Sequence, residues 1–399
     1  MIQCKLILKR ILERMIRLLI TGSGYVTSLA ILLIILFLFR DSLKLFQQPV
    51  VESSYELVVS ENNPVRKLSP EQVMQIFDTD ITNWQQVGGP DIPIKVFRFT
   101  DLTEDYPHPV PLTSAQITDS LSALFQSEPG IICFLPRKQE LPPDAYILNL
   151  GDVSPEQFFA GKYWYPTITP VSQYGLLPLL LGTLWVSIGA IIFALPFSLA
   201  VAIYMAELAD KRLRAWLKPI IELLAGIPSV VYGFFGLVVI VPALQNIFHL
   251  PVGQTALAGS LVLGIMALPT IITVAEDALR TTPRAMKEAS MALGATHWQT
   301  IRNVTIPYAK SGIASAIVLG IGRAIGETMA VLMVTGNAAV IPHTFLEPVR
   351  TIPATIAAEL GEAAVGSSHY EALFALGAVL FMITLGISIA VEHISKNKY

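Results

Sequence analysis

Six stretches of the chain run for about 20 residues or more with few or no charged side chains. At roughly 1.5 Å of rise per residue, a helix of that length crosses the roughly 30 Å hydrocarbon core of a membrane. A composition of 53% hydrophobic and 14% charged residues agrees with this interpretation. The sequence therefore predicts an all-α polytopic membrane protein whose first span is a retained anchor rather than a removed signal peptide. The six predicted spans cover approximately residues 18–39, 174–205, 219–244, 255–274, 311–335 and 370–391.

Lysine and arginine gather in every second connection between these spans, and in both terminal segments. Basic connections stay in the cytoplasm, so both termini are predicted to be cytoplasmic. Cys4 and Cys133 then lie on opposite sides of the membrane and cannot form a disulfide, and two cysteines give no metal-site spacing. The sequence has no G-x-x-x-x-G-K-[ST] motif for a nucleotide, and we expect no metal and no cofactor.

Residues 41–173, between the first two spans, are polar and too long to be a loop without structure of its own. YELVVS, IPIKVFRF and GIICFL read as strands, and SPEQVMQIF reads as a helix capped by Ser69 with Pro70 in its first turn. We therefore expect a small α/β insert on the outer side of the membrane.

The segment from VVSENNP to FRFTD resembles part of the periplasmic phosphate-binding proteins, and SEPGIICFLP resembles a later strand of that family. Where the family has an R-S-D-G-S-G-T loop that holds phosphate, this chain reads RFTDLT from Arg98 onward. Arg98 is therefore the candidate ligand residue of the insert. Two interpretations stay open: the insert docks a separate binding protein or lines the entry path, or it only shields the outer face.

The connection between the fourth and fifth spans contains KEASMALGATHWQTIRNVTIP. Its pattern predicts a short helix near residues 286–293, a break at Gly294, and a second helical turn that ends before Pro307. The stretch resembles the E-A-A-x-x-x-G-x(9)-I-x-L-P loop of ABC importer permeases, with Glu288, Ala289, Gly294 and Pro307 in register. The resemblance implies that this helix inserts into a groove of a cytoplasmic ATPase. An ordinary interfacial helix is the alternative.

Arg323 and Glu327 stand in the most apolar part of the chain, where each charge costs roughly 2.5–3.5 kcal/mol. Four residues apart, they are predicted to share one face of a helix and to point into the bundle or a wet pathway. They could form an internal salt bridge that rigidifies a gate. Alternatively, the arginine fork could bind an oxyanion while the glutamate accepts a hydrogen bond from phosphate, which keeps a proton near neutral pH. Gly320, Gly322 and Gly326 would let a neighbouring helix approach closely.

Pro228, in GIPSVVYG, and Pro269, in MALPT, are predicted helix kinks. GRAIGETMAVLMVTGN together with ELLAGIPSVVYGFFGL resembles the PstC-type permeases of bacterial phosphate ABC transporters, over nearly all of residues 174–398. The sister PstA-type permeases typically read G-E-T-A-P where this chain has GETMA.

The resemblance implies a type I ABC importer (MetI-like) fold in the bacterial inner membrane, with six transmembrane helices. Its parts would be the N-terminus and first helix (1–40), the α/β insert (41–173), and a permease domain (174–399) with a coupling loop at 279–308. It also implies a PstA-type sister permease, a PstB-type ATPase dimer that hydrolyses the ATP, a periplasmic phosphate-binding protein and inorganic phosphate as substrate. The chain itself would be no enzyme, would contact membrane lipid and would bind no nucleic acid. Two alternatives stay open: a membrane scaffold or sensor of phosphate status, and an importer of another oxyanion such as molybdate or sulfate.

Overall fold

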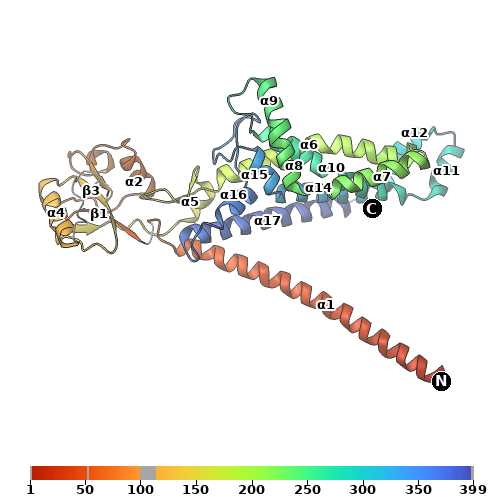
Figure 1. Cartoon of the computed structure of the whole chain (residues 1–399), viewed down its shortest axis with the longest axis horizontal. Helices are drawn as coiled ribbons and strands as arrows, with labels where there is room; N and C mark the ends of the chain where they lie inside the picture. The colour runs from red at the N-terminus through yellow and green to blue at the C-terminus, as the bar shows by residue number, and fades with distance from the viewer. Residues whose placement is uncertain (1, 52–53, 99–113, 397–399) are drawn as a thin grey trace.

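A small α/β unit stands at one end of an elongated molecule, and a helical bundle extends from it to the other end (Figure 1). The structure is a computed structural model that describes residues 2–51, 54–98 and 114–396. Helix α1 (Ile2–Lys44) leads into the α/β unit through the short helix η1 (Leu45–Gln47). The beginning of α1 and the end of α17 (Ser368–Lys396) both point toward the end of the molecule opposite the α/β unit.

The α/β unit is built on a four-stranded sheet of order β2-β3-β1-β4. β1 (Tyr55–Ser60) runs antiparallel to β3 (Ile131–Pro136) and to β4 (Ala145–Ile147), while β2 (Lys95–Arg98) runs parallel to β3. All three predicted strands are therefore confirmed. Helix α2 (Pro70–Phe77) also forms as predicted, because Ser69 and Gln72 make a reciprocal capping box at its start.

Strand alternation sends the apolar residues of the sheet to both of its faces. Leu57, Val59 and Ile132 join the cluster that includes α2, whereas Val58 and Cys133 join the cluster that includes α4 (Ser114–Ser127). The sheet is thus the middle layer of three. Burial in this second cluster raises the pKa of the Cys133 thiol to about 12, so the thiol stays protonated and unreactive.

A short hairpin joins the insert to the helical bundle. It follows α5 (Pro155–Ala160) and pairs β5 (Trp164–Tyr165) with β6 (Gln173–Tyr174). The apolar cluster on the α2 side of the sheet continues through Trp164 and Tyr174 into the bundle, where it takes in Leu176. The insert is therefore packed onto the bundle and not merely tethered to it.

The bundle centres on α10 (Ala256–Arg280), which begins at the Thr255 N-cap and is the most buried of the long apolar helices. Small residues bring it close to α6 (Leu177–Ile203). A side chain at Gly189 would collide with Ser260 Oγ, and Ser260 Oγ donates to the Val186 carbonyl at 3.2 Å. The other segments of the bundle are η3 (Tyr204–Leu208), α7 (Lys211–Ala225), α8 (Ser229–Phe235), η4 (Gly236–Ile240), α9 (Val241–Phe248), α11 (Arg284–Ala292), α12 (His297–Thr300), η5 (Ile301–Thr305), α13 (Ile306–Tyr308), α14 (Lys310–Gly326), α15 (Met329–Val334), α16 (Ile352–Glu359) and α17.

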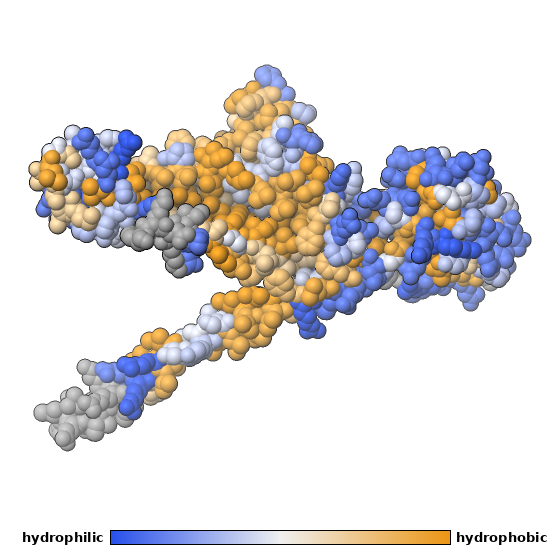
Figure 2. Space-filling view, turned by 180° about the vertical axis from the view of Figure 1, so that it is seen from behind, coloured by the Kyte–Doolittle hydropathy of each residue, from blue (hydrophilic) through white to orange (hydrophobic). Residues whose placement is uncertain are grey.

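In the part of the chain that the structure describes, five helices are long and apolar enough to cross a membrane, or up to six if the bent pair His297–Tyr308 and Lys310–Gly326 is one span. Figure 2 shows an orange apolar band between two ends where hydrophilic side chains gather, as expected of a membrane protein. Helix α1 packs on α17 through Phe37 on Phe374 and Phe39 on Phe381, then diverges from the bundle (Figure 1).

Two predicted spans are not continuous helices. The span expected at 219–244 is interrupted, because α7 ends at Ala225 and the apolar run begins again at Ser229. The span expected at 311–335 breaks after Gly326 and resumes at Met329. Each of these two spans is therefore made of two helical segments, since hydropathy measures apolar length but does not detect a break in the backbone, and the kink predicted at Pro228 is a full break.

Candidate functional site

The prediction that Arg323 and Glu327 share one helical face is wrong, because the helix break falls between them. Glu327 has extended backbone (φ −72°, ψ 135°) just after the end of α14. Arg323 Nη1 donates to Thr270 Oγ1 at 3.0 Å, whereas Glu327 Oε1 accepts from the Ala330 amide at 3.4 Å. No ion pair found among the described residues joins the two side chains, so the internal salt bridge is absent there.

Arg323 lies where three helices meet. Its hydrogen-bond partner Thr270 belongs to α10, and its charge also acts on the phenol of Tyr232 in α8. Tyr232 Oη donates to the Leu224 carbonyl at the end of α7, at 2.8 Å. Arg323 and Glu327 are both half-buried. A half-buried guanidinium with one donor held by a hydroxyl still has further N–H groups with which to meet an anion.

The glycines around this position differ in what they do. A side chain at Gly320 would meet Ile271 Cδ1 at 2.6 Å, so the close approach predicted there is confirmed. Nothing lies within 4 Å of a side chain built at Gly322 or Gly326, so the prediction is wrong for these two. Gly326 is instead the last residue of α14, at the helix break.

The two candidate prolines have different roles. Pro228 is the N-cap of α8, inside the break that follows Gly226, and is therefore not a kink within one helix. Pro269 lies inside α10, which continues past it to Arg280. Thr273 Oγ1 donates to the carbonyl of Pro269 itself at 2.8 Å.

The predicted coupling loop forms α11 and then turns sharply at Gly294. The Gly294 amide donates to the Met291 carbonyl, and the Ala295 amide donates to the Ser290 carbonyl. These bonds form a Schellman motif, which places Gly294 at φ +89°. The second helical part does not end before Pro307 as predicted, because Pro307 lies within α13.

One face of α11 is anchored and the other is open. Lys287 Nζ pairs with Glu207 of η3 at 2.5 Å, and Ser290 Oγ lies 3.0 Å from Thr300 Oγ1. Glu288 and Ala289 are exposed, and Leu293 is 90% exposed. The residues that match the family loop thus lie on a surface that no part of the described chain covers.

A cluster of charges lies at the α11 end of the bundle, where the sequence indicates Lys218 and Arg280 as partners of Glu276 but does not reveal Arg214. Glu276 of α10 is only 1% exposed, and its carboxylate pairs with Arg214 of α7 at 2.5 Å. Arg280 and Lys218 lie 3.7 and 4.0 Å from the same carboxylate. The cluster fixes α7 against α10 just before the helix break. The sequence signal was a carboxylate near the end of an apolar run, with a basic helix earlier in the chain.

A second missed site joins the insert to the bundle. Glu359, at the end of α16, accepts from Trp164 Nε1 of the hairpin at 3.0 Å and from Arg350 Nη1 at 2.7 Å. His369 Nε2, near the start of α17, lies 2.9 Å from the same carboxylate. Burial raises the pKa of Glu359, but the hydrogen bonds from His369 and Trp164 and the charge of Arg350 outweigh it, so the pKa is lowered overall. The carboxylate therefore stays ionised and holds three segments together.

Arg98 lies at the end of β2 and is exposed. Its Nη2 donates to the Phe77 carbonyl at 3.3 Å, and its guanidinium carbon lies 5.7 Å from the centre of the Phe77 ring. The remainder of the RFTDLT stretch lies outside the described residues. In the described part of the chain, no group of three or more His, Cys, Asp or Glu side chains could hold a metal ion.

These features define a multi-pass membrane protein with broken spans around a half-buried arginine, and with an α/β unit and the exposed helix α11 at opposite ends. Residues 198–397 match the family described as binding-protein-dependent transport system inner membrane component, and residues 39–102 match the PBP superfamily domain. The chain belongs to the first of these families, so it is a membrane component of an ABC transporter.

Several known proteins are similar to this chain. The probable ABC transporter permease protein YqgH of Bacillus subtilis is 39% identical over 62% of this chain and 80% of that protein. The phosphate transport system permease protein PstC of Mesorhizobium japonicum is 39% identical over 57% of this chain and 74% of that protein. Among solved structures, an inward-facing form of the MetNI methionine ABC transporter is 21% identical with a TM-score of 0.42, and covers 56% of this chain and 93% of that one.

Proposed function

We propose that the chain is a permease subunit of an ATP-driven phosphate importer and forms the path for inorganic phosphate with a sister permease. The observation that carries the proposal is Arg323, half-buried at a helix break and held by Thr270, in a chain that is 39% identical to a phosphate transport permease. Its guanidinium would receive the anion, and Glu327 would accept the hydrogen bond of a protonated phosphate oxygen. A carboxylate at this place disfavours fully ionised sulfate.

The arrangement of the chain supports a division of labour among partners. The insert and α11 lie at opposite ends of the molecule (Figure 1), as expected if they face opposite sides of the membrane. With the positive-inside rule, the insert faces outward, and both termini and α11 are cytoplasmic. Residues 1–40 would then be an anchor, 41–173 an external insert, and 174–399 the permease domain. Glu288 and Ala289 lie on the exposed face of α11, and Gly294 and Pro307 follow this helix in the chain. This surface would dock a separate ATPase dimer.

The mechanism that follows is alternating access. ATP binding and hydrolysis by the partner would move α11, and the helices after the insert would open first to the binding protein and then to the cytoplasm. Phosphate would pass Arg323 on the way. The chain itself would hydrolyse nothing.

Radiolabelled phosphate uptake tests the proposal in cells that express this chain with its sister permease, ATPase and binding protein. Losing a hydrogen bond to a charged group costs about 1.5–3 kcal/mol, so Arg323→Gln should reduce uptake by about 10-fold or more at equal membrane levels. Arg212→Gln, which changes an exposed arginine of α7, is the matched control and should leave uptake unchanged. Uptake that survives Arg323→Gln, or uptake competed equally by sulfate, would refute the proposed site. No uptake by the wild type would refute the transport function.

A further inference from the structure

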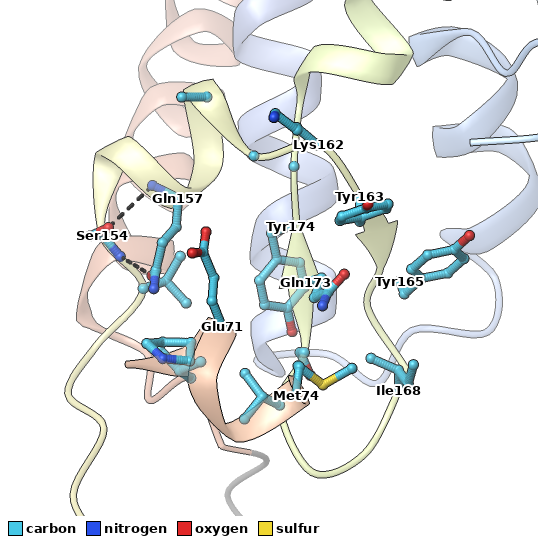
Figure 3. A pocket seen from close by; sticks show the side chains of 18 of the residues that line it. Glu71, Met74, Ser154, Gln157, Lys162, Tyr163, Tyr165, Ile168, Gln173 and Tyr174 are labelled. Atoms are coloured by element: carbon cyan, nitrogen blue, oxygen red, sulfur yellow. Dashed lines mark hydrogen bonds between the residues drawn. The ribbon is translucent and has the colours of Figure 1, made fainter. Parts of the chain in front are cut away.

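A groove of about 800 Å³ lies between helix α2 of the insert and the segment that runs from α5 through the β5–β6 hairpin (Figure 3). Glu71 and Met74 line it from α2. Tyr163, Tyr165 and Gln173 line it from the hairpin side, and Figure 3 shows them across from the helix. The groove thus opens where the insert meets the permease, away from the Arg323 site.

The hairpin presents two aromatic rings to this groove. Tyr163 and Tyr165 stack with ring centres 6.3 Å apart and planes 19° apart, yet they are 56% and 44% exposed. Strand alternation turns Trp164, between them, the other way, and it is only 1% exposed. Exposed tyrosine is typical of surfaces that bind a partner, because a rigid ring buries area at little entropic cost.

The charges around the groove are mostly negative. Glu71, Asp78, Asp80 and Glu156 line it, against the single positive charge of Lys162. All five side chains are exposed, and none of them takes part in the ion pairs found among the described residues. Such a lining repels a phosphate ion. It favours lysine or arginine side chains, which gain both from the carboxylates and from the faces of the two tyrosines.

From this groove we infer a docking site for the substrate-binding protein of the transporter, which would place a surface segment rich in lysine or arginine against the tyrosine pair. The inference rests on the proposed function for the outward orientation of the insert. Membership of a binding-protein-dependent family supplies a partner that must reach the outer face. Charge complementarity sets the chemistry of the segment that this partner brings.

The opposite face of the same hairpin connects the docking site to the permease. Trp164 donates to Glu359 at 3.0 Å, and Glu359 ends α16 and contacts the start of α17 through His369. A partner bound to Tyr163 and Tyr165 would therefore lie on one side of strand β5, and the contact between Trp164 and Glu359 of the permease helices lies on the other side. Docking at this place would hold the released substrate beside the bundle.

Binding of the transporter's own binding protein to the full chain, assembled with its sister permease and ATPase in nanodiscs, tests the inference. Glu71→Gln/Asp78→Asn/Glu156→Gln should weaken binding about tenfold at low salt and flatten its salt dependence, because exposed charge pairs are individually weak and are screened by salt. Tyr163→Ala/Tyr165→Ala should weaken binding by a similar factor but leave the salt dependence intact. Glu140→Gln, an exposed carboxylate outside the groove, should change nothing.

Wild-type affinity in both groove variants would overturn the inference, and so would absence of binding by the wild type. A change in the oligomeric state of the chain, without a change in binding, would assign the groove to a second copy and also overturn it. Phosphate uptake by the wild type, measured in parallel, separates the two proposals. If the wild type takes up phosphate and the groove variants still bind the binding protein normally, only the docking site is refuted. If binding depends on the groove but the wild type takes up no phosphate, only the phosphate function is refuted.

Discussion

Glu359→Gln is the change that most directly tests how the insert is held to the bundle. Glutamine has the same size and keeps one acceptor oxygen, but it removes the charge that pairs with Arg350 at 2.7 Å. Arg350 is then left with an unpaired charge, and its buried Nε already has no hydrogen-bond partner among the described residues. The two side chains are 20% and 13% exposed, so water would screen part of the loss.

Removing one partner of a buried ion pair costs roughly 3–5 kcal/mol, and the residual exposure reduces this to about 2–3 kcal/mol. For a protein of this size, we expect the apparent unfolding temperature in detergent to fall by about 5 °C. Glu362→Gln is the matched control, since Glu362 is exposed on the segment just after α16. A Glu359→Gln protein that unfolds at the wild-type temperature would refute the argument that this carboxylate holds the insert in place.

The same pair of proteins gives a pH test with a defined sign. The pKa of Glu359 is lowered in the folded protein, so the carboxylate stabilises the fold fully above its unfolded value of about 4.5. This stabilisation is lost only as the pH falls through the lower folded value. The difference between wild type and Glu359→Gln should therefore persist through neutral pH and shrink below about pH 4.5. A difference that already shrinks near neutral pH would contradict the assigned charge state.

Two further changes probe the permease. Thr270→Val keeps the shape of the side chain but removes the hydroxyl that accepts from Arg323, so KM for phosphate uptake should rise about tenfold. Thr270→Ser keeps the hydroxyl and should have a KM near that of the wild type. Equal KM values in both variants would show that Thr270 does not position the arginine. In Gly294→Val the valine must adopt the φ of +89° that Gly294 has, at a cost of about 1–3 kcal/mol, so less ATPase should co-purify with this variant. Asparagine tolerates this backbone region better, so Gly294→Asn should retain more of the ATPase. ATPase recovery that is equal for valine and asparagine would argue against a conformational role for Gly294.

Local patterns predicted the insert well because its signals are local. The short apolar runs in YELVVS and GIICFL, and the Ser69 cap with Pro70 behind it, are local signals for the strands and for α2. The end of α7 carried a local signal as well. Gly226 and Pro228 are the residues that terminate a helix, but they stand in an apolar run that we interpreted as one kinked span.

Other features depend on contacts that no short window contains. Trp164 and Glu359 are 195 positions apart, and only the folded hairpin brings the indole to the carboxylate. The break after Gly326 has no proline to announce it, so a helical period placed Arg323 and Glu327 on one face. The pairing of Glu276 with Arg214 likewise depends on how α7 lies against α10.

The two helix breaks are parts of one arrangement. α8 follows the first break and α15 follows the second, and a side chain at Gly233 of α8 would meet Ala330 Cα of α15 at 2.9 Å. The backbones of the two resumed helices therefore touch. Tyr232, the neighbour of Gly233, lies within the electrostatic reach of Arg323. Irregular backbone at membrane depth is tolerated only where protein buries it or where it lines a wet cavity, and the same condition permits a charged side chain there. The convergence of both breaks on Arg323 thus gives a physical reason for an arginine in the most apolar part of the chain.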